Sequence, residues 1–275
     1  MAVTLMPLSE PLGVEVTGID LSQPLDPEAR QGLEDALIEN MVMVVRDQDL
    51  SPTGLEAAVG HFGPLMQQHL TSLLMEGHPK IVVLDSAKTK VGADGKFVPI
   101  GARDWHTDHA HQERPPNYSA LFAVRLPPKG GDTGFANMQL GYARLGPDKR
   151  AELARHVVVT KIDDRYSTAK DRAAHREART HPLIRTHPVT GRQAIFFHPG
   201  MVDHLEGMSA EASRTYLEEL LEEVITPEIT YRHEWRSGDL VIMDNRGMMH
   251  IAHRDYDPMF GRILHRVLVE GEVPY

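Results

Sequence analysis

The chain has 275 residues, of which 41% are hydrophobic and 25% are charged, a composition typical of a folded globular protein. Acidic residues outnumber basic ones by 39 to 29, and the net charge of −10 argues against nucleic acid or an anionic membrane as the main partner. The absence of cysteine excludes disulfides, thiolate nucleophiles and iron–sulfur clusters. Any bound metal must therefore have nitrogen and oxygen ligands.

The start of the chain lacks the charged residues and the continuous apolar run of a signal peptide. No stretch is apolar over the roughly eighteen residues that a membrane span requires. We therefore expect a cytoplasmic protein whose partner is a small-molecule substrate. The sequence does not fix the oligomeric state, so a homo-oligomer stays open.

Short strands outnumber helices in the predicted secondary structure. In chain order the predicted elements are a strand at 13–20, a helix beginning at Asp26-Pro27, a buried strand at 41–45, a helix beginning at Ser51-Pro52, strands at 81–84, 119–124 and 194–197, a helix from Ser209 to about Val224, and strands at 240–243 and 263–269. Several short strands separated by Gly/Pro turns favour an antiparallel sandwich or barrel over a βαβ sheet.

One domain over residues 1–275 explains the chain better than two, because no composition shift marks a boundary. Two segments nevertheless differ from their surroundings. Residues 86–104 include a stretch rich in Lys and Gly and are predicted to form an active-site loop. Residues 163–180 are highly charged and are predicted to form a lid or a solvated insertion.

A candidate metal site lies in the run Asp-Trp-His-Thr-Asp-His at 104–109. In a strand, residues i and i+2 point to the same side, so His106 and Asp108 would present a nitrogen and a carboxylate to one ion. His250 follows the apolar run at 240–243 and would supply a third ligand from a distant strand. Two histidines and one carboxylate on one face of an ion are typical of non-haem Fe(II) oxygenases, although His-x-Asp alone is weak evidence.

Several further motifs accompany this site in a fixed order. They are WHTD at 105–108, PPKGGDT at 127–133, RTHPVTGRQAIF at 185–196, GDLVIMDNRGMMH at 238–250 and GRILHR at 261–266. On these motifs the chain resembles the taurine dioxygenase family of Fe(II)- and 2-oxoglutarate-dependent oxygenases, which also contains 2,4-dichlorophenoxyacetate dioxygenase. The resemblance covers nearly the whole chain. It implies a mainly β fold with flanking helices and a double-stranded β-helix, or jelly-roll, core.

The resemblance also implies roles for individual residues. His106, Asp108 and His250 would bind Fe(II), and Thr133 and Arg262 would bind the distal carboxylate of 2-oxoglutarate. A guanidinium offers two parallel donors to a carboxylate and a hydroxyl adds a third, which suits that assignment. Fe(II), 2-oxoglutarate and O2 are the implied cofactors, and succinate and CO2 are the implied products. Trp105 and Asn245 are expected to support the site from behind the ligands.

The substrate is expected to be a small anionic organic molecule that is hydroxylated, with C–S or C–O cleavage as an open consequence. Arg266 matches the family position that pairs with a substrate sulfonate, and His69 and Met201 are further substrate-binding candidates. Arg266 does not choose between a sulfonate and a carboxylate. His109 and His111 are expected to face solvent rather than substrate.

Two other classes stay open. A cupin-like hydrolase or isomerase would use the same three metal ligands without 2-oxoglutarate, and a catalytically inactive metal-binding relative would keep the fold alone. Succinate release discriminates, because such a hydrolase would not form it from 2-oxoglutarate.

Overall fold

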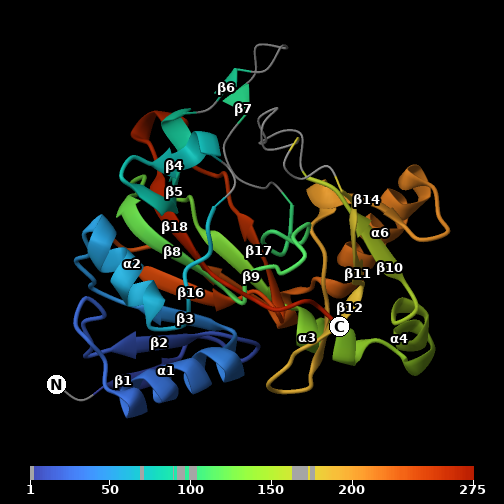
Figure 1. Cartoon of the computed structure of the whole chain (residues 1–275), viewed down its shortest axis with the longest axis horizontal. Helices are drawn as coiled ribbons and strands as arrows, with labels where there is room; N and C mark the ends of the chain where they lie inside the picture. Colours follow the sequence, from blue (N-terminus) through green and yellow to red (C-terminus); the bar gives the residue numbers. More distant parts are fainter. Residues whose placement is uncertain are drawn as a thin grey trace.

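The computed structural model describes residues 3–68, 71–88, 90–91, 97–98, 104–162, 173 and 177–275. Its central element is an eight-stranded sheet (Figure 1). From one edge to the other, this sheet consists of β1 (Thr4–Pro7), β2 (Val14–Thr17), β3 (Val42–Val45), β16 (Leu240–Asp244), β8 (Tyr118–Arg125), β18 (Ile263–Val269), β5 (His78–Asp85) and β4 (Leu74–Met75). Only β2 and β3 pair in parallel among the strand pairs of the described residues.

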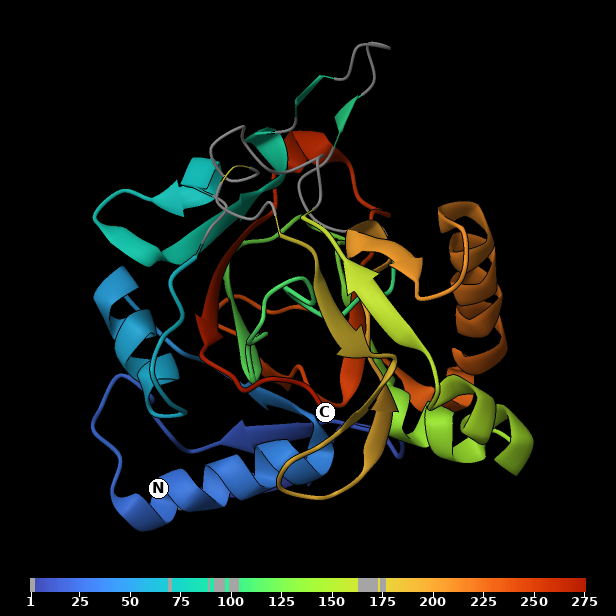
Figure 2. The same cartoon turned by 45° about the vertical axis from the view of Figure 1, so that its right-hand side comes forward.

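Shorter sheets form the opposite side of the fold. They are β15 (Thr230–His233) with β9 (Thr133–Asn137) and β17 (Met248–Ala252), β12 (Ile184–Thr186) with β13 (Gln193–Ile195), and β11 (Arg179–Pro182) with β10 (Val157–Thr160) and β14 (Val202–Leu205). Figure 2 shows these strands and those of the large sheet arranged around a common centre. The architecture is the predicted jelly roll. A separate ribbon of β6 (Lys90–Val91) and β7 (Phe97–Val98) lies at the top of Figure 1.

Three buried apolar clusters hold the layers together. One lies between the two sets of strands and includes Leu121 of β8, Val241 of β16, Phe135 of β9 and Met248 of β17. A second cluster packs α1 (Pro27–Asn40) and α2 (Pro52–Gly60) on the outer face of the large sheet. The third packs α3 (Met138–Arg144), α4 (Pro147–Leu153) and α6 (Ala210–Val224) around the shorter sheets. Burial of these apolar side chains supplies the main favourable term in folding.

The predicted starts of three helices are confirmed. They could be predicted because helix capping depends on residues within a single turn. The side chains of Asp26, Ser51 and Ser209 each accept a hydrogen bond from a backbone N–H in the first turn of α1, α2 and α6. The strand predicted from residue 41 begins one residue later. Met41 ends α1 with a φ of 60°, and its backbone N–H donates to the carbonyl of Leu37.

The remaining elements are short. Five 3₁₀ turns occur among the described residues, at Thr71–Leu73, Ser86–Lys88, Pro199–Met201, Pro227–Ile229 and Pro258–Phe260. Most of the two predicted loops, 86–104 and 163–180, lies outside the described residues, as does His69. Within the described ranges, no helix combines the length and the apolar character needed to cross a lipid bilayer.

Candidate metal centre

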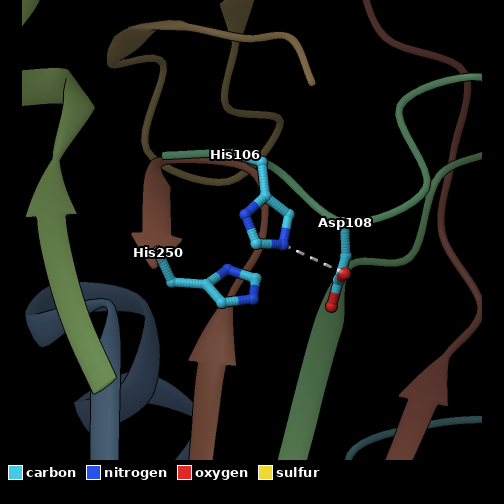
Figure 3. Close-up of side chains that lie close together, drawn as sticks. All are labelled: His106, Asp108 and His250. Carbon is cyan, nitrogen blue, oxygen red and sulfur yellow. Dashed lines mark ion pairs between the residues drawn. The ribbon is translucent and has the colours of Figure 1, made fainter. Parts of the chain in front are cut away.

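Two histidines from distant parts of the chain meet across an isolated antiparallel bridge. The backbone N–H of His106 donates to the carbonyl of His250 at 3.1 Å, and the reciprocal hydrogen bond measures 2.9 Å. The bridge places the two imidazole ring centroids 4.1 Å apart, with the Asp108 carboxylate beside them (Figure 3). The predicted triad is thus brought together in space.

The geometry that the sequence predicted for His106 and Asp108 is wrong in one respect. The two residues do not lie on a regular strand, because His106 forms a single bridge and Asp108 begins a turn. The turn is fixed by Asn245, whose amide oxygen accepts from the Asp108 N–H at 2.8 Å and whose amide nitrogen donates to the Asp108 carbonyl at 3.0 Å. Asn245 therefore supports the site as expected.

The three side chains form the one group among the described residues that has the ligand types and spacing to hold a metal ion. One donor atom from each lies within 4.8 Å of the others, and all three residues are buried. His106 Nδ1 donates to the carbonyl of Asp104 at 2.8 Å, so the proton sits on Nδ1 and Nε2 keeps its lone pair for a metal. Two imidazole nitrogens and a carboxylate fit Fe(II).

The electrostatics also prepare these groups for a cation. Burial lowers the pKa of His106, and it lowers the pKa of His250 to about 3, so both rings are neutral at neutral pH. Burial alone would raise the pKa of Asp108, but Arg266 and the nearby imidazoles hold it far below its usual range. The centre consequently offers two lone pairs and one negative charge.

The lowered pKa of His250 makes the stability of the metal-free protein depend on pH. The ordinary pKa is 6.5 and the folded pKa is about 3, so between these values the unfolded chain binds a proton that the folded chain does not. We expect the free energy of unfolding to fall as the pH drops from 7 to 5. Urea unfolding in the presence of a chelator measures this slope, and it should be shallower in His250→Phe. Equal slopes for the wild type and His250→Phe would contradict a lowered pKa of His250 in the folded protein.

The predicted 2-oxoglutarate residues also lie together. Arg262 donates through Nε to the carbonyl of Gly131 at 2.7 Å and through Nη2 to the hydroxyl of Thr133 at 3.3 Å. Trp235 donates to the same hydroxyl at 3.0 Å. Arg262 is only 7% exposed, and burial lowers its pKa to about 10. Since no carboxylate of the described residues forms an ion pair with it, its surroundings fit a carboxylate supplied by a ligand.

Arg266 contacts the triad directly through Asp108. Its Nη1 donates to Asp108 Oδ1 at 3.0 Å, and its Nη2 lies 3.0 Å from His109 Nε2. A guanidinium can only donate, so the His109 nitrogen accepts this hydrogen bond. Arg266 is 9% exposed as a residue and brings a positive charge to the edge of the metal centre.

The expectation that His109 and His111 face solvent is wrong. They are 2% and 5% exposed, respectively. His109 has a φ of 51°, in the left-handed region, and lies in the turn that begins at Asp108. His111 Nδ1 lies 3.0 Å from the sulfur of Met201, which places the substrate-binding candidate Met201 next to this buried histidine.

Two residues near the triad were not singled out from the sequence. Ser119, on β8, donates through its hydroxyl to Asp108 Oδ2 at 2.9 Å. His198 packs its ring against that of His106, with the centroids 4.7 Å apart. Two features of the sequence could have indicated them. Ser119 is the polar residue at the start of the otherwise apolar run at 119–124, and His198 directly follows the apolar run at 194–197. Trp105 packs closely against Gly134, where an added Cβ would lie 2.9 Å from the indole ring.

The jelly-roll fold and the buried His-Asp-His group, with an arginine and a threonine nearby, define the class of non-haem metal oxygenases. Comparison with known proteins identifies the family. Residues 4–268 match the model of the family described as taurine catabolism dioxygenase TauD, TfdA. The chain therefore belongs to the TauD/TfdA family.

Individual relatives agree with this assignment. The chain is 34% identical to the alpha-ketoglutarate-dependent 2,4-dichlorophenoxyacetate dioxygenase of Cupriavidus pinatubonensis, over 97% of each protein. It is 32% identical to the alpha-ketoglutarate-dependent sulfate ester dioxygenase of Pseudomonas putida, over 98% of this chain and 89% of that protein. The crystal structure of AAD-2 in complex with Mn(II) and N-oxalylglycine superposes with a TM-score of 0.82 at 27% identity, covering 100% of this chain and 99% of the other.

The expected reaction class is thereby confirmed. The protein is a 2-oxoglutarate-dependent dioxygenase of small organic substrates, with Fe(II), 2-oxoglutarate and O2 as cofactors. The cupin-like hydrolase and the inactive relative are not supported.

Proposed function

We propose that this dioxygenase hydroxylates a small sulfonate or carboxylate at a carbon a few bonds from the acid group. The observation that carries the proposal is Arg266, a buried guanidinium that directly contacts the metal-binding group. A protein with a net charge of −10 repels anions at long range, so an anionic substrate needs a focused positive charge inside the site. The names of two relatives, a phenoxyacetate dioxygenase and a sulfate ester dioxygenase, support an anionic substrate.

Within this proposal each residue of the site has one task. His106, Asp108 and His250 bind Fe(II), and Thr133 and Arg262 bind the distal carboxylate of 2-oxoglutarate. When bound, iron and 2-oxoglutarate supply the oxidation: 2-oxoglutarate is converted to succinate and CO2, and one oxygen atom of O2 enters the substrate.

The substrate-binding residues act by orientation. Arg266 anchors the acid group, and Met201, beside His111, lines the substrate site. His69, outside the described residues, is proposed as a further substrate-binding residue. Holding the reacting carbon in one place is the main contribution that the protein makes to such chemistry. Where hydroxylation falls on a carbon that carries sulfur or oxygen, we propose that C–S or C–O cleavage follows.

We also propose that residues 1–275 act as a single catalytic domain, with 86–104 as an active-site loop and 163–180 as a lid or insertion. The match of the family model to residues 4–268 supports the single domain.

The acid-group anchor predicts a preference that depends on Arg266. In the wild type, a small sulfonate or carboxylate should have a higher kcat/KM than its neutral amide or ester. In Arg266→Gln the ratio of kcat/KM for the acid to kcat/KM for the neutral analogue should fall by at least about tenfold. Loss of the positive charge weakens binding of the acid and leaves binding of the neutral compound unaffected. Coupled succinate release measures both substrates.

A control separates anchoring from damage to the metal site, since Arg266 also contacts Asp108. The Mn(II) dissociation constant of Arg266→Gln reports any loss of metal binding, and the acid-to-neutral ratio is independent of the fraction of loaded enzyme. Arg192, an exposed arginine paired with Glu39, provides the matched variant Arg192→Gln, which should retain the wild-type ratio. Equal turnover of acid and neutral substrates by the wild type would refute the anchor.

A further inference from the structure

The two oxygens of the Asp108 carboxylate have different partners. Oδ1 accepts from Arg266 Nη1 at 3.0 Å and lies 3.8 Å from His106 Nε2. Oδ2 accepts from the hydroxyl of Ser119 at 2.9 Å. The main chain of Asp108 is held separately by Asn245. Rotation of the carboxylate about its own Cβ–Cγ bond is therefore limited by Arg266 on one oxygen and Ser119 on the other.

Ser119 occupies a position where packing alone requires no hydroxyl. It lies on β8 in the large sheet, opposite Met243 of β16 and Leu268 of β18, and it is 0% exposed. The residues that follow on the same face of β8, Leu121 and Ala123, belong to the apolar core between the sheets. A hydroxyl buried among such residues destabilises the fold unless it is hydrogen-bonded. The Asp108 carboxylate supplies that hydrogen bond.

The arrangement also suits the carboxylate. An ionised carboxylate is an acceptor with several lone pairs, so one hydrogen bond to Oδ2 still leaves lone pairs for a metal. Hydrogen bonds to metal-ligating side chains fix their orientation, and loss of such a bond typically weakens metal binding by roughly 10- to 100-fold. Ser119 reaches Asp108 from a strand of the large sheet, independently of the turn that carries the carboxylate.

We infer that Ser119 is a positioning residue that holds the Asp108 carboxylate in its metal-binding orientation. This role is independent of which substrate the enzyme hydroxylates. It requires only that Asp108 is a metal ligand.

The test is an equilibrium titration of the full chain with Mn(II), without 2-oxoglutarate or substrate, so that the readout is independent of activity. In Ser119→Ala the Mn(II) dissociation constant should rise by roughly 10- to 100-fold. Ser213 provides a matched control, because it is also fully buried and its hydroxyl makes two hydrogen bonds: it donates to the carbonyl of Ser209, before α6, and accepts from the N–H of Leu205 on β14. Ser213→Ala should keep the wild-type dissociation constant, even though the metal-free protein loses thermal stability.

A conservative variant completes the test. Ser119→Thr retains the hydroxyl and should restore most of the Mn(II) affinity that Ser119→Ala loses. Should Ser119→Ala fail to fold, Ser119→Cys replaces it, because a thiol is the weaker donor and should bind Mn(II) less tightly than Ser119→Thr. Wild-type affinity in the variant without a hydroxyl would overturn the inference, and so would an equal loss in Ser213→Ala. Failure of Asp108→Ala to weaken Mn(II) binding would instead refute the metal assignment itself.

Discussion

His250→Ala should abolish succinate formation and weaken metal binding by more than about 100-fold, the upper end of the effect of losing a residue behind the ligands. The variant removes one of the two nitrogen ligands in the group, so that only one imidazole and one carboxylate remain to bind the ion. Equivalent losses are expected for His106→Ala and Asp108→Ala. Mn(II) titration together with coupled succinate release measures both consequences.

The fold should survive the loss of these ligands. Buried neutral imidazoles contribute little to the apolar core, and the backbone bridge between His106 and His250 needs no side chain. His187, buried and hydrogen-bonded to Asp244 at 3.0 Å, is the matched control, because His187→Asn changes a buried histidine that is absent from the metal-binding group. The control should bind Mn(II) like the wild type. A His250→Ala protein that retains full activity at limiting iron would contradict the metal assignment.

Arg262→Ala should weaken 2-oxoglutarate binding without changing the affinity for metal. Removal of one partner from a buried ion pair typically raises the binding free energy by about 2–5 kcal/mol, which corresponds to a roughly 30- to 4,000-fold higher dissociation constant. Thr133 would still offer one hydroxyl, but a neutral donor does not replace the charge. Anaerobic titration of the Mn(II)-loaded protein with 2-oxoglutarate measures the change.

Two controls limit the interpretation of that titration. The Mn(II) dissociation constant of Arg262→Ala should equal that of the wild type, because Arg262 makes no hydrogen bond or ion pair with the triad among the described residues. Arg192→Gln removes an exposed arginine and should leave both constants unchanged. If 2-oxoglutarate binds Arg262→Ala as tightly as the wild type, another residue must hold its distal carboxylate.

Features that depend on neighbouring residues could be predicted from the sequence. Asp26, Ser51 and Ser209 cap their helices through hydrogen bonds within a single turn, so a short sequence window contains the whole interaction. The apolar run at 240–243 forms a central strand of the large sheet, because both faces of β16 pack against apolar clusters and every residue of the run is buried. The jelly-roll fold and the three metal ligands were predictable from several motifs in a fixed order rather than from any single motif.

Features that depend on how the chain turns in three dimensions could not be predicted in this way. Ser119 lies 11 residues from Asp108, and only the fold of the intervening turn brings its hydroxyl to the carboxylate. His109 and His111 are buried, and His109 has a left-handed backbone conformation that composition does not reveal. A polar run such as 109–114 is more often solvated, but here residues 109–111 are buried.

The most direct test of the proposed site is the addition of O2 to anaerobically assembled protein containing Fe(II), 2-oxoglutarate and a small sulfonate or carboxylate. The wild type should release one succinate for each 2-oxoglutarate consumed and one hydroxylated product for each succinate, whereas Asp108→Ala should release neither. The contradictory result is succinate and product formation by Asp108→Ala at the wild-type rate, which would place the reacting metal away from His106, Asp108 and His250.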